Sequence, residues 1–535
     1  MSSSPRLDAS FNGAVRHLIV VLGDQLDHSA AVLSDLDPEL DAILMMEVDA
    51  EAAGTGAGIR SHKQRTAFFL SAMRHFALEQ MDAGIRVRYI KLDAPQNTHA
   101  LGTELKRAVR VLSPKLIRMT HPGEWRVLDE IEDAAAEADT ELEIVDDNHF
   151  FTTPGDFEKW AKGRKSLTME YFYREQRRRL GYLMDGDDPE GGEWNYDKQN
   201  RETFKSPPRI PNLYQPQSDE VTEEVIQLVQ SRYPDNPGSL DRFIWPVTRD
   251  QARRALKRFI ETRLDDFGPY EDAMWAGEPF LYHAVLSAPL NLKLLNPREC
   301  VEAAIEAYRD GTACLNSVEG FVRQLIGWRE FIRGVYWTQG RDYRDRNGLK
   351  QYGDLPEFYY TGDTDMRCMS ECLKPVIDHA WSHHIPRLMV LSNFALISGV
   401  QPRAIGDWFF EMYADAVDWV TTPNTIGMGM HADHAVVGTK PYSGSGKYID
   451  RMSNFCKDCA YDKNKRVPDD KGKPPCPFNT FYWDFLIRNR DRFRGNNRMA
   501  MILKNVDRMS DNDRTEITVH GRKLRKQFGI GAISS

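Results

Sequence analysis

The sequence predicts an α/β amino-terminal domain built on a doubly wound parallel sheet, followed by a large all-α domain. The chain has 535 residues, more than a single hydrophobic core usually supports. Short apolar runs alternate with amphipathic stretches through the first ~150 residues, which is the pattern of strand–helix repeats in a domain-sized segment. After residue 225 the apolar positions follow a helical period, and few segments resemble strands.

Five apolar runs are expected to form the strands of the sheet, and they span residues 18–22, 42–48, 85–92, 116–119 and 142–145. Amphipathic stretches at 62–81 and 103–112 lie between them, so helices should cover both faces of a parallel sheet. Such sheets bind ligands at the carboxyl ends of their strands. The candidate contacts are therefore residues 23–25 and 47–51. No GxGxxG loop follows the first strand, which disfavours an ordinary dinucleotide site.

The composition shifts suggest a flexible tail over residues 1–14, the α/β domain over 15–150, a linker over 151–225 and the helical domain over 226–535. The linker prediction rests on residues 185–217, which are rich in Gly, Pro, Asp and Asn and show no sustained period. The clearest helix spans residues 317–337. Its apolar positions should line one buried face, with Arg323, Glu330 and Arg333 off that face; they are Phe321, Leu325, Trp328, Ile332 and Val335.

The bulk composition describes a soluble globular protein, with 41% hydrophobic and 28% charged residues. The sequence begins without the apolar run of a secretory signal, and no stretch approaches the length of a membrane span. We therefore expect a cytoplasmic, monomeric protein with no membrane partner. The net charge of −9 disfavours nucleic acid as a partner, although a local basic face is enough for binding.

Four of the seven cysteines are spaced like the ligands of a metal centre. Cys456, Cys459 and Cys476 read C-x2-C-x16-C, and Cys368 lies far upstream. In a reducing cell such cysteines are more often metal ligands than disulfides. Zinc sites usually combine two close pairs within a short module, so the remote fourth cysteine favours an iron–sulfur cluster, with zinc as the alternative. Cys372, one helical turn after Cys368, complicates the choice; Cys300 and Cys314 are expected to be ordinary buried thiols.

Two further segments carry candidate chemistry. His383 and His384 precede Pro386, which suits the first turn of a helix, so the imidazoles would lie at a positive helix end that favours a bound anion and disfavours the protonated imidazole. The alternative is a solvated histidine pair at a helix cap. Residues 163–179 interleave basic and aromatic side chains, which suits phosphate binding and base stacking, or simply a solvated helix face.

Together these segments resemble the iron–sulfur bacterial cryptochromes and photolyases, also called prokaryotic (6-4) photolyases. The resemblance rests on the four spaced cysteines and on long segments in the family's order, and it extends from residue 23 to about residue 494. The segments are GRKSLTMEYFYRE at 163–175, GGEWNYDKQNR at 191–201, EGFVRQLIGWREFIRGVYW at 319–337 and HHIPRLMVLSNFAL at 383–396.

The resemblance implies the cryptochrome/photolyase fold, with FAD in the helical domain and a 4Fe–4S cluster on Cys368, Cys456, Cys459 and Cys476. It also implies an antenna, 6,7-dimethyl-8-ribityllumazine, in the first domain, where Asp24 and Glu51 match the family's acidic contacts. Positions that match the family's FAD contacts are His283, Leu286, Ser287, Gln324, Trp328, Arg329, Asp415 and Asn424.

The resemblance also assigns an electron route to the flavin. Trp408 matches the family's flavin-proximal electron donor, and Tyr360 stands where a relative has tryptophan. A tyrosine is harder to oxidise without losing its proton, so photoreduction is expected to differ here. Val417 replaces an aromatic residue, and Thr421 stands where an acidic residue is expected.

His384, with His383 beside it, matches the histidine that the family needs for (6-4) repair, and Tyr442 matches a lesion-contacting tyrosine. Reversing a (6-4) photoproduct moves a hydroxyl between two bases, which requires a proton donor beside the flipped lesion. The implied function is blue-light-driven repair of UV-damaged DNA, single- or double-stranded, held by a basic face around Arg174 and residues 488–498; such an enzyme would be nucleoid-associated when bound. The alternatives are a cryptochrome-type photoreceptor with the same cofactors, and a zinc-stapled DNA-binding protein without photochemistry.

Overall fold

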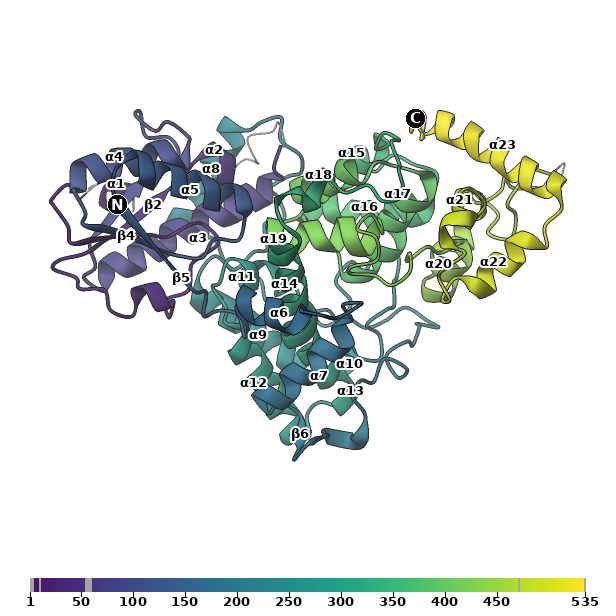
Figure 1. Cartoon of the computed structure of the whole chain (residues 1–535), viewed down its shortest axis with the longest axis horizontal. Helices are drawn as coiled ribbons and strands as arrows, with labels where there is room; N and C mark the ends of the chain where they lie inside the picture. The colour runs from purple at the N-terminus through teal and green to yellow at the C-terminus, as the bar shows by residue number, and fades with distance from the viewer. Residues whose placement is uncertain (1–3, 9–10, 53–59, 470–471, 534–535) are drawn as a thin grey trace.

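A five-stranded parallel sheet forms the centre of the amino-terminal region (Figure 1). The computed structural model describes residues 4–8, 11–52, 60–469 and 472–533. The strands are β1 (His17–Val20), β2 (Ala42–Met46), β3 (Val87–Ile90), β4 (Leu116–Thr120) and β5 (Glu141–Val145). Their order is β3-β2-β1-β4-β5, and every neighbouring pair is parallel. The order reverses between β1 and β4, which is where a sheet of this kind opens a ligand-binding crevice.

Helices cover both faces of the sheet, as the sequence predicts. In β1, Ile19 packs toward α3 (Lys63–Asp82), while Leu18 and Val20 pack toward α4 (Leu101–Leu112) and α5 (Trp125–Glu137). This alternation follows from the two-residue period of a strand. Two short helices, α1 (Ser4–Asp8) and α2 (Asp49–Ala52), flank the sheet, and α8 (Glu220–Arg232) packs against α3.

The segment between the sheet and the helical region is partly ordered against its neighbours. Its helices α6 (Pro154–Ala161) and α7 (Met169–Leu180) pack on the long central helix, with Phe157, Trp160 and Phe172 clustered around Phe331. Residues 185–217 contain little regular structure. It consists of the end of β6 (Met184–Asp185), which pairs with β7 (Asp188–Pro189), and of a short helical turn at Glu190–Gly192. The domain boundaries at 150 and 225 stay predictions.

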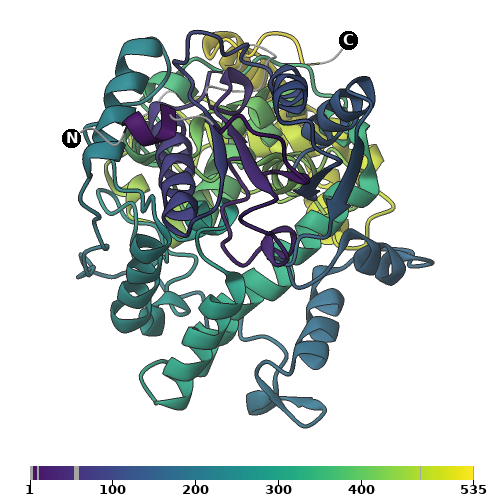
Figure 2. The same cartoon turned by 90° about the vertical axis from the view of Figure 1, so that its left-hand side faces the viewer.

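The rest of the chain is helical, which confirms the predicted fold class. Figure 2 looks onto the amino-terminal sheet, with the helical region lying behind it. The remaining helices are α9 (Arg249–Thr262), α10 (Leu264–Phe267), α11 (Ser287–Asn291), α12 (Pro297–Arg309), α13 (Leu315–Arg323), α14 (Glu330–Gln339), α15 (Phe358–Thr361), α16 (Arg367–His379), α17 (Asn393–Ser398), α18 (Pro402–Met412), α19 (Asp418–Thr422), α20 (Gly446–Met452), α21 (Pro477–Phe493), α22 (Ala500–Asp507) and α23 (Asp511–Gln527). In the described part of the chain, none of the helices has the length and apolarity needed to cross a bilayer.

Three π-helical turns interrupt this region. They are η3 (Gln324–Arg329), which joins α13 to α14, η5 (Pro386–Ser392), which leads into α17, and η6 (Pro423–Gly429), which follows α19. Such turns are rare and occur often at functional sites. The predicted helix at 317–337 is therefore one helical run with a π turn at its middle. Arg323, Glu330 and Arg333, which lie off the apolar stripe, are buried as well. Arg323 forms an ion pair with Asp197, Glu330 lies 3.5 Å from the Arg329 guanidinium, and Arg333 donates to the Thr152 carbonyl at 2.9 Å.

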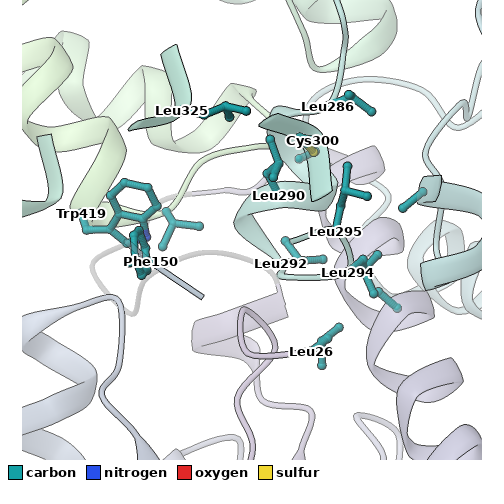
Figure 3. Close-up of a cluster of buried hydrophobic side chains, with 14 of the residues drawn as sticks. Leu26, Phe150, Leu286, Leu290, Leu292, Leu294, Leu295, Cys300, Leu325 and Trp419 are labelled. Carbon is teal, nitrogen blue, oxygen red and sulfur yellow. The ribbon is translucent and has the colours of Figure 1, made fainter. Parts of the chain in front are cut away.

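A buried interface fixes the sheet against the helical region. Lys293 forms an ion pair with Asp147 at 2.9 Å, and both side chains are buried. The ring of His149 hydrogen-bonds the carbonyl of Leu295 at 2.9 Å, and the backbone N–H of Leu26 donates to Leu292 at 3.0 Å. Figure 3 shows the apolar part of this contact, where Leu26 and Phe150 approach side chains of the helical region.

Candidate active site and metal centre

Three histidines from two segments meet in one cluster, in which His283 and His383 are buried and His384 is partly exposed. The rings of His283 and His383 stack with centroids 4.1 Å apart, and His384 lies edge-on to His283 at 5.7 Å. Nε2 of His283 and Nδ1 of His383 are buried without a hydrogen-bond partner. Buried polar atoms are normally satisfied, so these two nitrogens indicate groups that a bound molecule would meet. The structure thus brings the predicted flavin contact His283 against the predicted repair residues.

The loop before α11 is held in an unusual backbone conformation. Leu281 has φ 43° and Val285 has φ 55°, in the left-handed region. For a β-branched residue such as Val285 this conformation is a marked outlier, and strain of this kind concentrates at functional sites. It turns the chain so that His283 reaches the histidine cluster, while Leu286 packs in the core and Ser287 begins α11.

Arg387, which the sequence reasoning did not single out, anchors Asp415 beside this cluster. Its guanidinium donates to both carboxylate oxygens of Asp415, at 3.0 and 2.9 Å, and the side chain of Asn291 donates to the Asp415 carbonyl at 2.7 Å. This bidentate geometry fixes both partners. Through Asp415, these contacts connect turn η5, which carries Arg387, with α11, which carries Asn291 and Ser287.

The predicted contacts on η3 and η6 divide into two groups. Gln324 donates to the Glu271 carboxylate at 3.1 Å, Trp328 is half-buried, and Asn424 donates to the Val420 carbonyl at 2.8 Å. Arg329 is directed elsewhere: it hydrogen-bonds His149 at 3.0 Å and lies 4.0 Å from the centre of the Phe150 ring. Its guanidinium therefore belongs to the interface between the two regions.

Two acidic residues, neither of which the sequence reasoning named, set the charge of His384. Nε2 of His384 lies 3.6 Å from the Asp272 carboxylate, and about half of the His384 side chain is exposed. Burial lowers the pKa of His384, but the interaction with Asp272 and the charges of Glu271 and Asp272 outweigh it, so the pKa is raised. The opposite holds for His383, whose pKa burial lowers well below its ordinary value.

This finding corrects the prediction that a helix end would disfavour the charged imidazole. Helical structure does begin at His384, as Pro386 suggests. The Asp272 carboxylate, 3.6 Å from the ring, and the charge of Glu271 favour the protonated imidazole, and they outweigh the partial charge of the helix terminus. The buried acid Glu271 has a raised pKa because of its own burial, and it receives hydrogen bonds from Gln324 and Asn200.

Tyr442 shares a charged neighbour, Asp197, with Glu271 of the histidine site. Burial raises the pKa of Tyr442, the charge of Arg498 lowers it, and the charge of Asp197 raises it. Asp197 forms an ion pair with Arg323, and both of these charges also act on Glu271. Tyr442 is half-buried beside Gly438, where an added Cβ would lie 3.4 Å from its ring.

Trp408 is completely buried on α18 and is surrounded by aromatic side chains. Its indole N–H donates to the Tyr359 carbonyl at 3.1 Å. The next residue, Tyr360, is partly exposed and donates its hydroxyl to Glu411 at 3.0 Å. Trp408 and Tyr360 are thus connected through a single hydrogen bond and one peptide unit.

The four spaced cysteines line one pocket, together with Met366, Phe455 and Tyr461. Cys368 lies on α16, Cys456 and Cys459 lie on and just after a short turn at Phe455–Asp458, and Cys476 caps α21. Burial, followed by the neighbouring thiols, raises the pKa of Cys456 to about 12; burial raises that of Cys476 to about 11. Cys372 is buried but lies outside this lining, and Cys300 is an ordinary buried thiol.

Asp24 is buried in the segment after β1, next to the reversal of strand order, where a sheet of this kind is expected to have its ligand-binding crevice. A Cβ added to Gly123 would lie 2.7 Å from its carboxylate and 3.2 Å from Val417, so Asp24 faces the helical region across Gly123. Val417 therefore lies on the other side of Gly123 from Asp24. Glu47 has a structural role, because its carboxylate accepts hydrogen bonds from Arg74, Tyr89 and the Leu92 backbone. The side chain of the other predicted antenna contact, Glu51, is outside the described residues.

The predicted basic face is partly neutralised by internal contacts. Arg174 forms an ion pair with Glu170 at 2.7 Å, and Arg178 lies 4.4 Å from the centre of the Trp194 ring. Within 488–498, Arg488 pairs with Asp484 and Arg490 with Asp507. Thr421 lies half-buried on α19.

Comparison with known proteins agrees with this arrangement. Residues 19–245 match the family model described as deoxyribodipyrimidine photo-lyase-related protein. A (6-4) photolyase of Agrobacterium fabrum is 46% identical over 505 residues, which is 94% of this chain and 97% of that protein. Two solved structures share the fold: a bacterial class III photolyase from Agrobacterium tumefaciens (TM-score 0.56, 13% identity, 97% and 99% coverage) and a Synechocystis cryptochrome (TM-score 0.56, 12% identity, 96% and 99% coverage).

The likeness to the solved structures concerns architecture alone, whereas the identity to the Agrobacterium fabrum protein extends over nearly all of both chains. The chain belongs to the (6-4) photolyase family of bacteria.

Proposed function

We propose that this protein repairs (6-4) pyrimidine–pyrimidone photoproducts in UV-damaged DNA under blue light. Bound FAD, in its reduced form, would supply one electron to the flipped-out lesion. His384 acts as the proton donor to the lesion, and Tyr442 contacts it. The observation that carries this proposal is the pairing of half-exposed His384 with Asp272, because the carboxylate holds a proton on an imidazole that a substrate can still reach.

The residues for FAD are proposed as His283, Leu286, Ser287, Gln324, Trp328, Asp415 and Asn424. Two observations support this set: the unpartnered nitrogens of the stacked histidines, and the π turns that carry Gln324 and Asn424. Arg387 supports the pocket through Asp415. Arg329 contributes by fixing His149 at the interface, since its guanidinium is engaged there.

The cysteine pocket is proposed to hold a 4Fe–4S cluster. Its four cysteines come from α16, from the turn at Phe455–Asp458 and the residue after it, and from the start of α21. Zinc sites usually combine two close pairs within a short module, so ligands from such distant segments favour a cluster over a single ion. The raised thiol pKa values of Cys456 and Cys476 also mean that these groups need a cationic centre to become thiolates at neutral pH.

The crevice beside Asp24 is proposed to bind the lumazine antenna, with Glu51 as the second acidic contact. Its position at the reversal of strand order supports this assignment. Asp24→Asn should reduce the lumazine content of the purified protein while FAD stays bound. Full lumazine absorbance in that variant would place the antenna elsewhere.

The DNA partner is proposed to bind across the half-exposed His384 site, with basic side chains around Arg174 and residues 488–498 contacting phosphates. Because many of these arginines already have carboxylate partners, binding should rest on a few of them, such as Arg178. Neutralising a phosphate contact lowers affinity uniformly across sequences and reduces the salt dependence of binding.

The proposed activity is tested by incubating the protein with oligonucleotides that carry either one (6-4) photoproduct or one cyclobutane dimer, under blue light and in the dark. We expect loss of the (6-4) lesion only in the illuminated sample. Protein that binds FAD and absorbs blue light but leaves both lesions intact would instead be a cryptochrome-type photoreceptor.

A further inference from the structure

Three tyrosines surround the electron donor Trp408, and they differ in where a phenolic proton can go. The ring of Tyr359 lies 5.1 Å from Trp408, and that of Tyr413 lies 5.8 Å away. Tyr360 follows Tyr359, whose carbonyl accepts the Trp408 indole N–H. An oxidised tyrosine is a very strong acid, so its oxidation is favourable only when a base takes the proton at the same time.

Tyr359 and Tyr413 have no suitable base. The hydroxyl of Tyr359 donates to the Leu391 carbonyl at 2.8 Å, and that of Tyr413 shares a hydrogen bond with the Ser382 hydroxyl at 2.9 Å. Neither partner accepts a proton at neutral pH. The Arg387 guanidinium also lies 4.1 Å from the centre of the Tyr413 ring, where its charge opposes loss of an electron.

Tyr360 has both a base and access to solvent. Its hydroxyl donates to a carboxylate oxygen of Glu411 at 3.0 Å, and the side chain is 38% exposed. Glu411 lies three residues after Trp408 on α18, so one rigid helix positions the buried indole and the carboxylate. The distance is that of a hydrogen bond, so the proton can move without rearrangement of either side chain.

We propose that Tyr360 is the outer electron donor of this protein and that Glu411 is the base that takes its phenolic proton. This inference rests on the proposed function, because it requires FAD to be bound beside Trp408. It also explains how a tyrosine can stand where a relative has tryptophan: the helix that carries Trp408 supplies the proton acceptor that tyrosine needs.

Bound oxidised FAD, when excited, would supply the oxidant that takes one electron from Trp408. One electron then passes from the Tyr360 ring to oxidised Trp408, which is restored to its neutral form. At the same time the O–H bond of Tyr360 breaks and its proton forms a new O–H bond on Glu411. The products are a neutral tyrosyl radical and a neutral carboxylic acid. An external reductant such as a thiol then returns a hydrogen atom to the exposed Tyr360.

The surroundings of Glu411 set the pH range of this step. Arg60 approaches from the segment before α3, with its backbone N–H at 3.1 Å and its guanidinium at 3.9 Å, and the His62 N–H donates to the Glu411 carbonyl. Asp407 adds a like charge on the same helix. Burial raises the pKa of Glu411, against the lowering effects of Tyr360 and Arg60. The ability of Glu411 to accept a proton is present above that raised pKa and is lost as the pH falls through it.

The test follows radicals by flash absorption spectroscopy of the protein loaded with oxidised FAD. In the native protein the Trp408 radical should give way to a long-lived neutral tyrosyl radical, more slowly in D2O than in H2O. Tyr360→Phe should abolish the tyrosyl signal, whereas Tyr359→Phe and Tyr413→Phe should retain it. A tyrosyl signal that survives Tyr360→Phe would overturn the assignment of the donor.

The proton acceptor is tested by a double-variant comparison. Glu411→Gln should remove the tyrosyl signal in the native background, but it should leave electron transfer unchanged in Tyr360→Trp, because an indole can lose an electron without losing its proton. Equal losses in both backgrounds would mean that Glu411 is only structural and would overturn the proposal. If Glu411→Gln does not fold, two measurements on the native protein replace it: the slowing of tyrosyl formation in D2O and the loss of tyrosyl yield at low pH. Absence of both effects would contradict proton transfer to Glu411. Failure to see any Trp408 radical in FAD-loaded protein would overturn the proposal, because it removes the inner donor that Tyr360 must reduce; the proposed function is tested separately, by repair with chemically pre-reduced protein.

Discussion

At the scale of single residues, the charge of His384 depends on neighbours that no local pattern reveals. Asp272 and Glu271 lie more than a hundred positions away in the sequence, so their contact with His384 exists only in the folded chain. The sequence predicts His384, Trp408 and the four cysteines as site residues, because each lies in a distinctive segment, and these roles stay predictions. The sequence also predicts Arg329 as a flavin contact. In the structure its guanidinium hydrogen-bonds His149 and lies over the Phe150 ring, at the interface between the two regions.

The pairing with Asp272 predicts a pH dependence of repair. His384 must be protonated to act as an acid, and its raised pKa keeps it protonated to a higher pH, so repair should fall as pH rises through that value. Asp272→Asn removes the charge that raises the pKa, so the alkaline limb of the repair profile should move to lower pH. The profile of pre-reduced enzyme measures this shift, and an unmoved limb would show that another group titrates.

Trp408→Phe should slow photoreduction of the flavin strongly, because a phenyl ring is much harder to oxidise than an indole. Repair by chemically pre-reduced protein should remain nearly native, since Trp408 is completely buried and its indole N–H donates to the Tyr359 carbonyl, away from the proposed lesion site. The comparison of photoreduction rate with repair yield separates the two effects. Unchanged photoreduction in this variant would mean that another aromatic side chain feeds the flavin.

At the scale of elements, periodicity predicts the strands and long helices well but not their interruptions. Each of the five strands overlaps one of the predicted apolar runs, and α3 covers the predicted helix at 62–81 to within one residue at each end. The π turn η3 leaves no signal in an apolar stripe, because it inserts one extra residue per turn without changing residue type. The burial of Arg323 and Glu330 is likewise not visible in the stripe, because Asp197 and Thr152, which bind them, come from other parts of the chain.

The cysteine pocket joins α16 to α20 and α21, so its metal should contribute to folding. Cys456→Ser should abolish the visible absorbance of the cluster and lower the yield of soluble protein, because binding of a structural metal contributes directly to the free energy of folding. Cys372→Ala is the matched control: it removes a buried thiol one turn from Cys368 but outside the pocket lining. Brown, stable Cys456→Ser protein would show that the ligand set is different.

At the scale of the whole molecule, a buried ionic interface holds the sheet at a fixed position relative to the helical region. The predicted two-region architecture is confirmed, but the sequence gives no indication of how the regions meet. The contact depends on pairs such as Asp147 with Lys293 and His149 with Leu295, each separated by more than a hundred residues. A fixed interface would keep the distance between the proposed antenna and the flavin constant.

Lys293→Met should destabilise the protein by about 3–5 kcal/mol, because it leaves the buried Asp147 carboxylate without its partner. The pKa of Asp147 is lowered in the folded state, although burial alone would raise it, because the charge of Lys293 leads the opposing contributions. The stability that Asp147 contributes is therefore present above its unfolded pKa and is lost as pH falls toward its folded value. Denaturant unfolding at neutral pH measures the loss of unfolding free energy. Lys257→Ala is the control: it removes an exposed ion pair with Glu261, so the unfolding free energy should change little. A native unfolding midpoint for Lys293→Met would contradict the account of the interface.

The most direct test of the account as a whole is the number of (6-4) lesions repaired per absorbed photon by pre-reduced native protein and by His384→Ala, measured together with a DNA-binding titration. We predict that His384→Ala binds FAD and damaged DNA like the native protein but loses about a hundredfold to ten-thousandfold of its repair, which is the usual contribution of a general acid. Near-native repair by His384→Ala, or a loss of repair fully explained by lost DNA binding, would contradict the assignment of His384 as the proton donor.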